Sequence, residues 1–220
     1  MFPNRPFQNR QDAALRLAGR LTQYRGADGL VLAIPRGGVP VGYTVARALE
    51  LPLEVALAKK IGHPHNSEYA IGAVTPAGVV LDEQARHVPA EYVRAEVARL
   101  QARLRANYRL FMGDREPTSL AGKTVIVVDD GIATGHTMAA TVQAVRAGQP
   151  RRLVVAVPVA PPQAQREFAP LVDEFVCLLL PPDFRAVGQY YDDFGQVSDE
   201  EVVALLQANA VEFGPGAAAA

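Results

Sequence analysis

The sequence is poor in several features that would mark particular classes of protein. It has one cysteine, Cys177, so it cannot form an internal disulfide or a zinc site built from several cysteines. No apolar stretch reaches the roughly 20 residues that a transmembrane helix needs, and residues 1–10 lack the apolar segment of a signal peptide. A formal net charge of -1 gives no overall attraction for nucleic acid or an anionic membrane. These absences predict a cytoplasmic protein with neither nucleic acid nor a membrane as a partner.

Two common phosphate-binding motifs are also absent. Gly122-Lys123-Thr124 looks like the end of a P-loop, but Pro117 stands where the motif requires its first glycine. The same segment precedes an apolar run, whereas a P-loop follows one. Gly37, Gly38 and Gly42 do not have the spacing of a Rossmann fingerprint. Any phosphate must therefore be bound by a site of another kind.

Apolar runs of strand length alternate with segments of helical periodicity along the chain. Strands are expected at 29–34, 53–58, 69–74, 79–81, 124–128, 152–159 and 174–179, and helices at 11–22, 39–49, 89–111, 137–146, 163–168 and 199–208. This pattern predicts an α/β fold: a doubly wound, mostly parallel sheet flanked by helices. Because 220 residues are few for two full domains, we expect a single domain over 1–220 with its core at 24–180. Residues 214–220 carry no structural pattern, and we expect them to be disordered.

One segment combines the features of a binding site. The apolar run Thr124–Val128 ends in Asp129 and Asp130, and a loop of small residues and hydroxyls leads into a helix. In an open α/β sheet, ligands bind beyond the carboxyl ends of the strands. Small residues let backbone N–H groups converge on an anion, and the helix N-terminus adds its positive end. The two carboxylates would repel a phosphate, so their natural partners are ribose hydroxyls or water on a magnesium ion.

Residues 127–137 resemble the motif of type I phosphoribosyltransferases that binds 5-phosphoribosyl-1-pyrophosphate (PRPP): hydrophobic residues, two acids, a small-residue loop and Thr-Gly-x-Thr. The resemblance implies that Asp129 and Asp130 are catalytic residues that orient the ribose and hold Mg²⁺ through water. It also implies a loop for the 5′-phosphate made of Gly131, Ile132, Ala133, Thr134, Gly135, His136 and Thr137. Gly131 departs from the family, in which many members carry an aliphatic residue at this position.

Two further segments fall where the family binds pyrophosphate. The first is Arg36-Gly37-Gly38, which follows the first strand and offers a guanidinium and free N–H groups. The family often has a cis peptide in this loop, for which Arg36–Gly37 is the candidate bond. The second is Lys59-Lys60, two of only three lysines in the chain. The polar residues that follow, Ile61–Glu68, are interpreted as a mobile loop that closes over substrate.

The acceptor site is less defined by the sequence. The family holds its acceptor base with a variable hood, for which 82–115 and 181–212 are the candidate segments. Phe184 follows the last core strand and is our candidate for stacking on the base, although it could equally pin the C-terminal segment to the core. Five arginines lie on the helix at 89–111, and most are expected to form a solvated face paired with Glu91 and Glu96.

The resemblance therefore implies a glycosyltransferase of nucleotide metabolism, with PRPP and a nitrogen acceptor such as a nucleobase as substrates and Mg²⁺ as cofactor. A non-catalytic regulator that senses PRPP or a nucleotide on the same fold is the main alternative. A PRPP synthetase is disfavoured, because no ATP site is apparent. The identity of the acceptor stays open, and so does a homodimer, which is common in the family.

Overall fold

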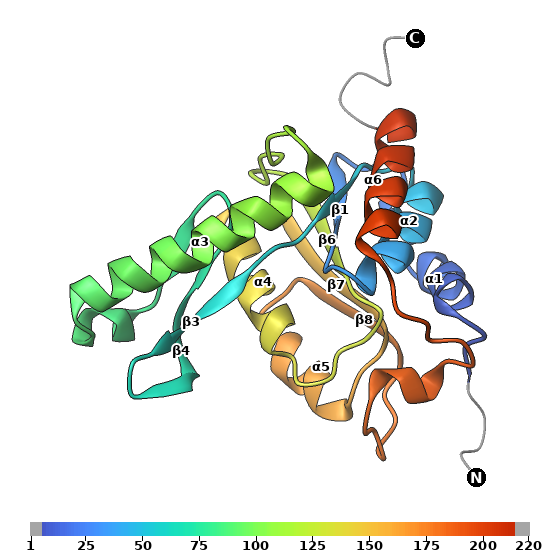
Figure 1. Ribbon diagram of the computed structural model, residues 1–220. Helices are drawn as coiled ribbons and strands as arrows, with labels where there is room; N and C mark the ends of the chain where they lie inside the picture. Colours follow the sequence, from blue (N-terminus) through green and yellow to red (C-terminus); the bar gives the residue numbers. More distant parts are fainter. Residues whose placement is uncertain (1–5, 214–220) are drawn as a thin grey trace.

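The computed structural model describes residues 6–213, and a five-stranded sheet forms their centre (Figure 1). All its strands run parallel, in the order β2-β1-β6-β7-β8. They are β1 (Gly29–Ala33), β2 (Leu53–Val55), β6 (Thr124–Val128), β7 (Arg152–Val159) and β8 (Glu174–Leu179). Because β1 and β6 are paired neighbours, the loops that follow them meet at one edge of the sheet.

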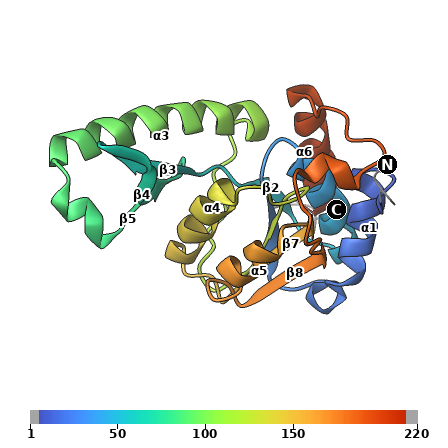
Figure 2. The ribbon, with the colours of Figure 1, turned by 90° about the horizontal axis from the view of Figure 1, so that it is seen from below.

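Helices cover both faces of this sheet, as the alternation of strands and helices predicts (Figure 2). One face packs against α1 (Arg10–Gly19), α2 (Gly38–Leu49) and α6 (Asp199–Phe213), and the other against α4 (His136–Ala147) and α5 (Pro162–Phe168). The central strand β6 is buried throughout. Its Ile126 and Val128 face the first set of helices, while Val125 and Val127 face the second. The predicted doubly wound fold is therefore confirmed.

A second, smaller sheet extends from the main body and carries the longest helix (Figures 1 and 2). It is antiparallel, in the order β3-β4-β5. Its strands are β3 (Lys59–His63), β4 (Asn66–Val74) and β5 (Val79–Leu81); the 3₁₀ turn η2 (Glu83–His87) and α3 (Ala90–Met112) follow. Ile61, Ile71 and Val74 bury their side chains against Leu100 and Leu104 of α3. We call this unit the β3–α3 arm.

Residues Ile61–Glu68, interpreted as a mobile loop, belong to the β3–β4 hairpin and have a tight turn at Pro64-His65. The loop assignment is therefore wrong, while closure of this segment over substrate stays a prediction. The hairpin was missed because its tip is polar and carries no continuous apolar run; Ile61 buries its side chain against α3. The expected strand at 53–58 is also too long, since the pairing of β2 with β1 ends at Val55.

The N-terminal segment of the described chain packs on the segment between β8 and α6. Phe7 forms a parallel β-bridge with Tyr191, and their rings lie 5.3 Å apart. The 3₁₀ turn η3 (Val187–Tyr190) precedes this bridge, and α6 follows it. The predicted disorder of 214–220 lies outside the described residues. Within 6–213, no helix is long and apolar enough to cross a membrane.

Candidate functional site

The loop after β6 forms the centre of the candidate site. Asp129 and Asp130 follow the last residue of the strand, and the N–H of Ile132 donates to the carbonyl of Val159 at 3.0 Å. Ile132 is buried, so it anchors the loop to the core. Gly135 caps α4 with φ of 76°, a left-handed conformation that favours glycine. The loop therefore has a fixed path from the strand into the first turn of the helix.

The exposed part of this loop carries the groups that could bind a phosphate. Ala133, Thr134, His136 and Thr137 are all solvent-exposed. His136 and Thr137 belong to the first turn of α4, whose backbone N–H groups have no partner within the helix. An exposed helix N-terminus and two hydroxyls are groups that can bind an anion.

Gly131 is the position at which this loop departs from the family pattern, and the structure supplies a reason. A Cβ placed on Gly131 would lie 2.6 Å from a methyl carbon of Val187. Val187 comes from the C-terminal segment and occupies the space that a larger side chain at 131 would fill. The aliphatic contact is therefore made by a residue distant in sequence.

The Arg36-Gly37-Gly38 loop packs directly against the two acids. A Cβ on Gly37 would lie 2.0 Å from Oδ2 of Asp130, and one on Gly38 would lie 2.9 Å from Cα of Asp129. Both positions therefore require glycine. The loop does contain a non-proline cis peptide, but the bond is Pro35–Arg36, so the expectation of a cis Arg36–Gly37 bond is wrong.

Replacing Gly38 with alanine should lower the free energy of unfolding by about 1–3 kcal/mol, because the new methyl group meets backbone atoms that cannot move aside. Gly19→Ala is a matched control, since a Cβ there has no atom within 4 Å. Urea denaturation of both variants measures the difference. Equal midpoints for the two variants would contradict the packing described here.

Asp129 and Asp130 lie in an environment that disfavours negative charge. Burial raises the pKa of Asp129 well above its usual value, and the charge of Asp130 raises it further. Burial also raises the pKa of Asp130, although the neighbouring Arg10 guanidinium counteracts part of that effect. Hydrogen-bond donors or a cation would therefore stabilise the ionised form of these two adjacent, partly buried carboxyl groups.

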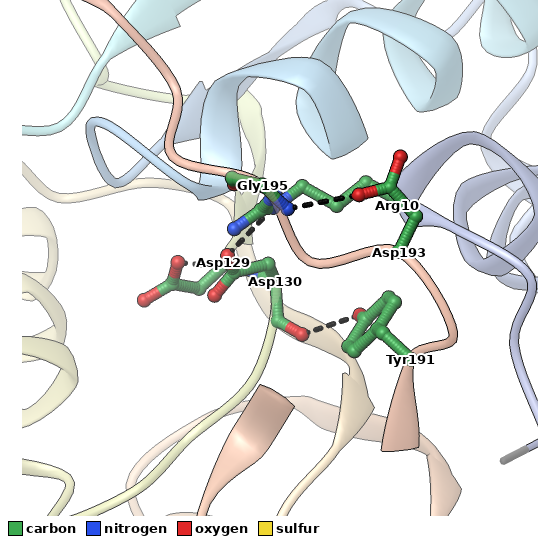
Figure 3. A network of polar contacts seen from close by, with 6 residues as sticks. All are labelled: Arg10, Asp129, Asp130, Tyr191, Asp193 and Gly195. Atoms are coloured by element: carbon green, nitrogen blue, oxygen red, sulfur yellow. Dashed lines mark hydrogen bonds and ion pairs between the residues drawn. The ribbon is translucent and has the colours of Figure 1, made fainter. Parts of the chain in front are cut away.

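Arg10 holds Asp130 in a network that joins the start of α1 and the segment before α6 to the loop after β6 (Figure 3). Its Nε donates to Oδ2 of Asp130 at 2.8 Å, and its Nη1 donates to the carbonyl of Gly195 at 2.8 Å. The guanidinium also lies over the ring of Phe194, at 3.9 Å from the centroid. The hydroxyl of Tyr191 donates to the backbone carbonyl of Asp130 at 2.6 Å. Sequence reasoning missed this network, because 120 residues separate Arg10 from Asp130.

The two acids consequently differ in what they can still bind. Oδ1 of Asp129 accepts the N–H of Asp130 at 2.8 Å, and Figure 3 shows its carboxylate pointing away from Arg10 and Tyr191. Asp130 already faces Arg10. Asp129 is therefore the more available carboxylate for a ligand.

A cleft of about 590 Å³ opens between the main body and the β3–α3 arm. Arg36, Lys59 and Thr137 line it, which brings the two predicted pyrophosphate segments to the end of the phosphate loop. Lys60 is next to Lys59 in β3 but does not line the cleft, since neighbouring strand residues point to opposite faces. Arg36 is exposed and lies 3.7 Å from Asp199.

The cleft also contains residues that the sequence analysis assigned to a solvated face. Arg99 and Arg103 of α3 line it together with Asn107. The expected pairing does occur for Arg99, which binds Glu96 through two hydrogen bonds of 2.6 and 2.9 Å. The four-residue spacing of 99, 103 and 107 was the signal that these side chains share one side of the helix.

Phe184, the candidate for stacking on a base, does not line this cleft. Its ring stacks on that of Tyr190, with centroids 5.7 Å apart and planes inclined by 11°. It packs on the cluster that contains Phe7 and Tyr191. In this structure Phe184 thus contributes to holding the C-terminal segment on the core.

The donor set around the acids fits a magnesium ion held mostly by other ligands. Asp129 offers a carboxylate oxygen, and among residues 6–213 no cluster of three or more metal-binding side chains occurs. Mg²⁺ typically takes one or two carboxylates and completes its shell with water and substrate phosphates. The residues present are compatible with that kind of site.

Comparison with known proteins agrees with the resemblance of residues 127–137 to the phosphoribosyltransferase motif. A model of the phosphoribosyl transferase domain matches residues 7–194. The crystal structure of the Thermus thermophilus protein TT1426 is 41% identical, with a TM-score of 0.84, over 92% of this chain and 98% of that chain. Two proteins of Mycobacterium tuberculosis, from strains CDC 1551 and H37Rv, are each 42% identical over 204 residues, or 91% of this chain; both carry the provisional name of phosphoribosyl transferase. The chain spans 46% of the length of these two relatives.

Proposed function

Because this chain belongs to the phosphoribosyl transferase domain family, we propose that it transfers the 5-phosphoribosyl group of PRPP to a nitrogen acceptor and releases pyrophosphate. The acceptor we propose is a nucleobase or a related heterocycle. The observation that carries this proposal is the juxtaposition of three groups at the carboxyl edge of β1 and β6: the buried acids, the Thr134–Thr137 loop, and the Arg36–Gly38 loop packed against those acids.

The proposed arrangement assigns each part of PRPP to a different group. The 5′-phosphate binds the N–H groups and hydroxyls of residues 131–137. The ribose hydroxyls donate to the carboxylate of Asp129, with Asp130 held beside it by Arg10. The pyrophosphate lies in the cleft near Arg36 and Lys59 and receives N–H groups from the Gly37-Gly38 turn.

This arrangement favours departure of pyrophosphate from the ribose. As the C1–O bond breaks, positive charge grows on the ribose ring and negative charge grows on the leaving group. Arg36 and Lys59 stabilise the second charge, and anchoring of the distant 5′-phosphate fixes the orientation of C1. When bound, Mg²⁺ would neutralise further charge on the pyrophosphate, with Asp129 and Asp130 as its protein contacts, in part through water.

The direct test is pyrophosphate release from PRPP and Mg²⁺ across a panel of nucleobases and other nitrogen acceptors. Release that depends on one acceptor supports the proposal and identifies the substrate. PRPP binding without release by any acceptor would favour a PRPP-sensing regulator. Failure to bind PRPP at all would contradict the proposal.

Alanine at Thr134 or Thr137 should weaken PRPP binding by about 10- to 100-fold, because each change removes a hydroxyl donor to a charged phosphate. Isothermal titration with PRPP and Mg²⁺ measures the effect. Thr22→Ala is the matched control, since Thr22 is exposed and lies in η1 (Thr22–Tyr24), remote from the β6 loop in sequence and outside the lining of the cleft. Unchanged affinity in both loop variants would argue against this loop as the phosphate site.

A further inference from the structure

The wall of the cleft formed by α3 carries a row of polar side chains. Arg99, Arg103 and Asn107 succeed one another at one-turn spacing and line the cleft. Leu100 and Leu104, each one residue further along the helix, are buried in the core of the arm. Figures 1 and 2 show α3 spanning from the small sheet to the main body.

The cleft is strongly cationic. Its charged lining residues are Arg36, Lys59, Arg99, Arg103 and a single carboxylate, Asp199. Asp199 lies near Arg36, and Glu96 binds Arg99. Among the described residues, Lys59 and Arg103 have neither a hydrogen bond nor an ion pair. A cleft lined mainly by charge of one sign attracts ligands of the opposite charge, here anions.

The pyrophosphate of PRPP accounts for only part of this charge. Arg36 and Lys59 come from the main body and from the start of β3, next to the Gly37-Gly38 turn where pyrophosphate is proposed to bind. Arg103 and Asn107 belong to the other wall, on α3. A guanidinium presents a planar pair of N–H donors that matches a carboxylate, and an amide one turn away adds a third donor.

We infer that the nitrogen acceptor carries a carboxylate, which binds Arg103 and Asn107. This inference rests on the proposed function, because it assigns the second substrate of the same site. It places acceptor selection in the β3–α3 arm, and Phe184 has no part in it.

The test compares acceptors with and without a carboxylate, on protein saturated with PRPP and Mg²⁺. Suitable pairs are nicotinate with nicotinamide, orotate with uracil, and anthranilate with aniline, with kcat/KM for the acceptor taken from the rate of pyrophosphate release. We expect kcat/KM to be at least 10-fold higher for the acid than for its neutral partner in one or more pairs. Arg103→Gln should abolish that preference and leave the affinity for PRPP unchanged. Arg94→Gln is the matched control, because Arg94 is exposed on the same helix and does not line the cleft.

Three results would overturn the inference. The first is the absence of an acid preference in every pair. The second is a preference that survives in Arg103→Gln. The third is a loss of PRPP affinity in Arg103→Gln, which would assign the arginine to pyrophosphate and leave the proposed function intact. Failure of the unaltered protein to bind PRPP is a separate outcome, which would remove both the proposed function and the inference.

Discussion

Replacing Arg10 with glutamine is expected to lower the free energy of unfolding by about 3–5 kcal/mol, the usual cost of breaking a buried ion pair from one side. The side chains of Arg10 and Asp130 are each 13% exposed, and the guanidinium makes one bond to the acid and another to the carbonyl of Gly195. Its loss leaves Asp130 buried beside Asp129 without a counter-charge. Chemical denaturation in ligand-free buffer measures the change.

Arg16→Gln provides the control for this experiment. Arg16 also binds an aspartate, Asp12, but its side chain is 51% exposed, so this substitution should cost less than about 1 kcal/mol. The double variant Arg10→Gln/Asp130→Asn should recover part of the loss, because it removes the uncompensated carboxylate as well. If Arg10→Gln were as stable as Arg16→Gln, the network in Figure 3 would not be a stabilising one.

The main sheet could be predicted from sequence because each of its strands is a short apolar run between helical segments. In β6, Val125 and Val127 pack in one layer of the core while Ile126 and Val128 pack in the other, so every position after Thr124 is apolar. The hairpin of β3 and β4 could not be predicted in this way. It is largely polar at its tip, and the helix that stabilises it follows later in the chain.

The candidate site, like the fold, could be predicted only in part. The acids and the loop to Thr137 are contiguous in the chain, so the sequence alone indicates what they could bind. Arg10 and Val187 are distant from this loop in sequence and reach it only through the folding of the chain, and no local pattern indicates either contact. Lys59 and Lys60 show that neighbours in sequence need not share a site. Both lie in β3, a strand that was not expected there, and adjacent side chains of a strand point to opposite faces.

Asparagine at position 129 should abolish transfer, with a loss of about 100-fold or more in kcat/KM, and at the same time stabilise the ligand-free protein by about 1 kcal/mol. The amide oxygen can still accept the N–H of Asp130, so the loop keeps its hydrogen bond. What disappears is a buried negative charge beside another carboxylate. Thermal denaturation at neutral pH without Mg²⁺, together with a pyrophosphate-release assay, measures both effects.

The stabilisation expected from Asp129→Asn should depend on pH. Burial raises the pKa of Asp129 in the folded protein, so over the range between its unfolded and folded pKa values the folded state retains a proton that the unfolded state has lost. The free energy of unfolding contributed by this residue therefore falls as the pH rises through that range. In Asp129→Asn that fall should be absent, and the gain over the unaltered protein should be largest above it.

Asp130→Asn separates the two carboxylates, because among the described residues Asp130 forms an ion pair with Arg10 and Asp129 forms none. It removes that ion pair together with a disfavoured charge, so it should stabilise the protein less than Asp129→Asn does, although transfer should be impaired in both. A larger gain in stability for Asp129→Asn, with a common loss of activity, would mean that Asp129 is kept for substrate at the expense of the fold. Destabilisation by Asp129→Asn would mean that Asp129, too, is held by contacts within the protein, and its assignment to the ribose would then fail.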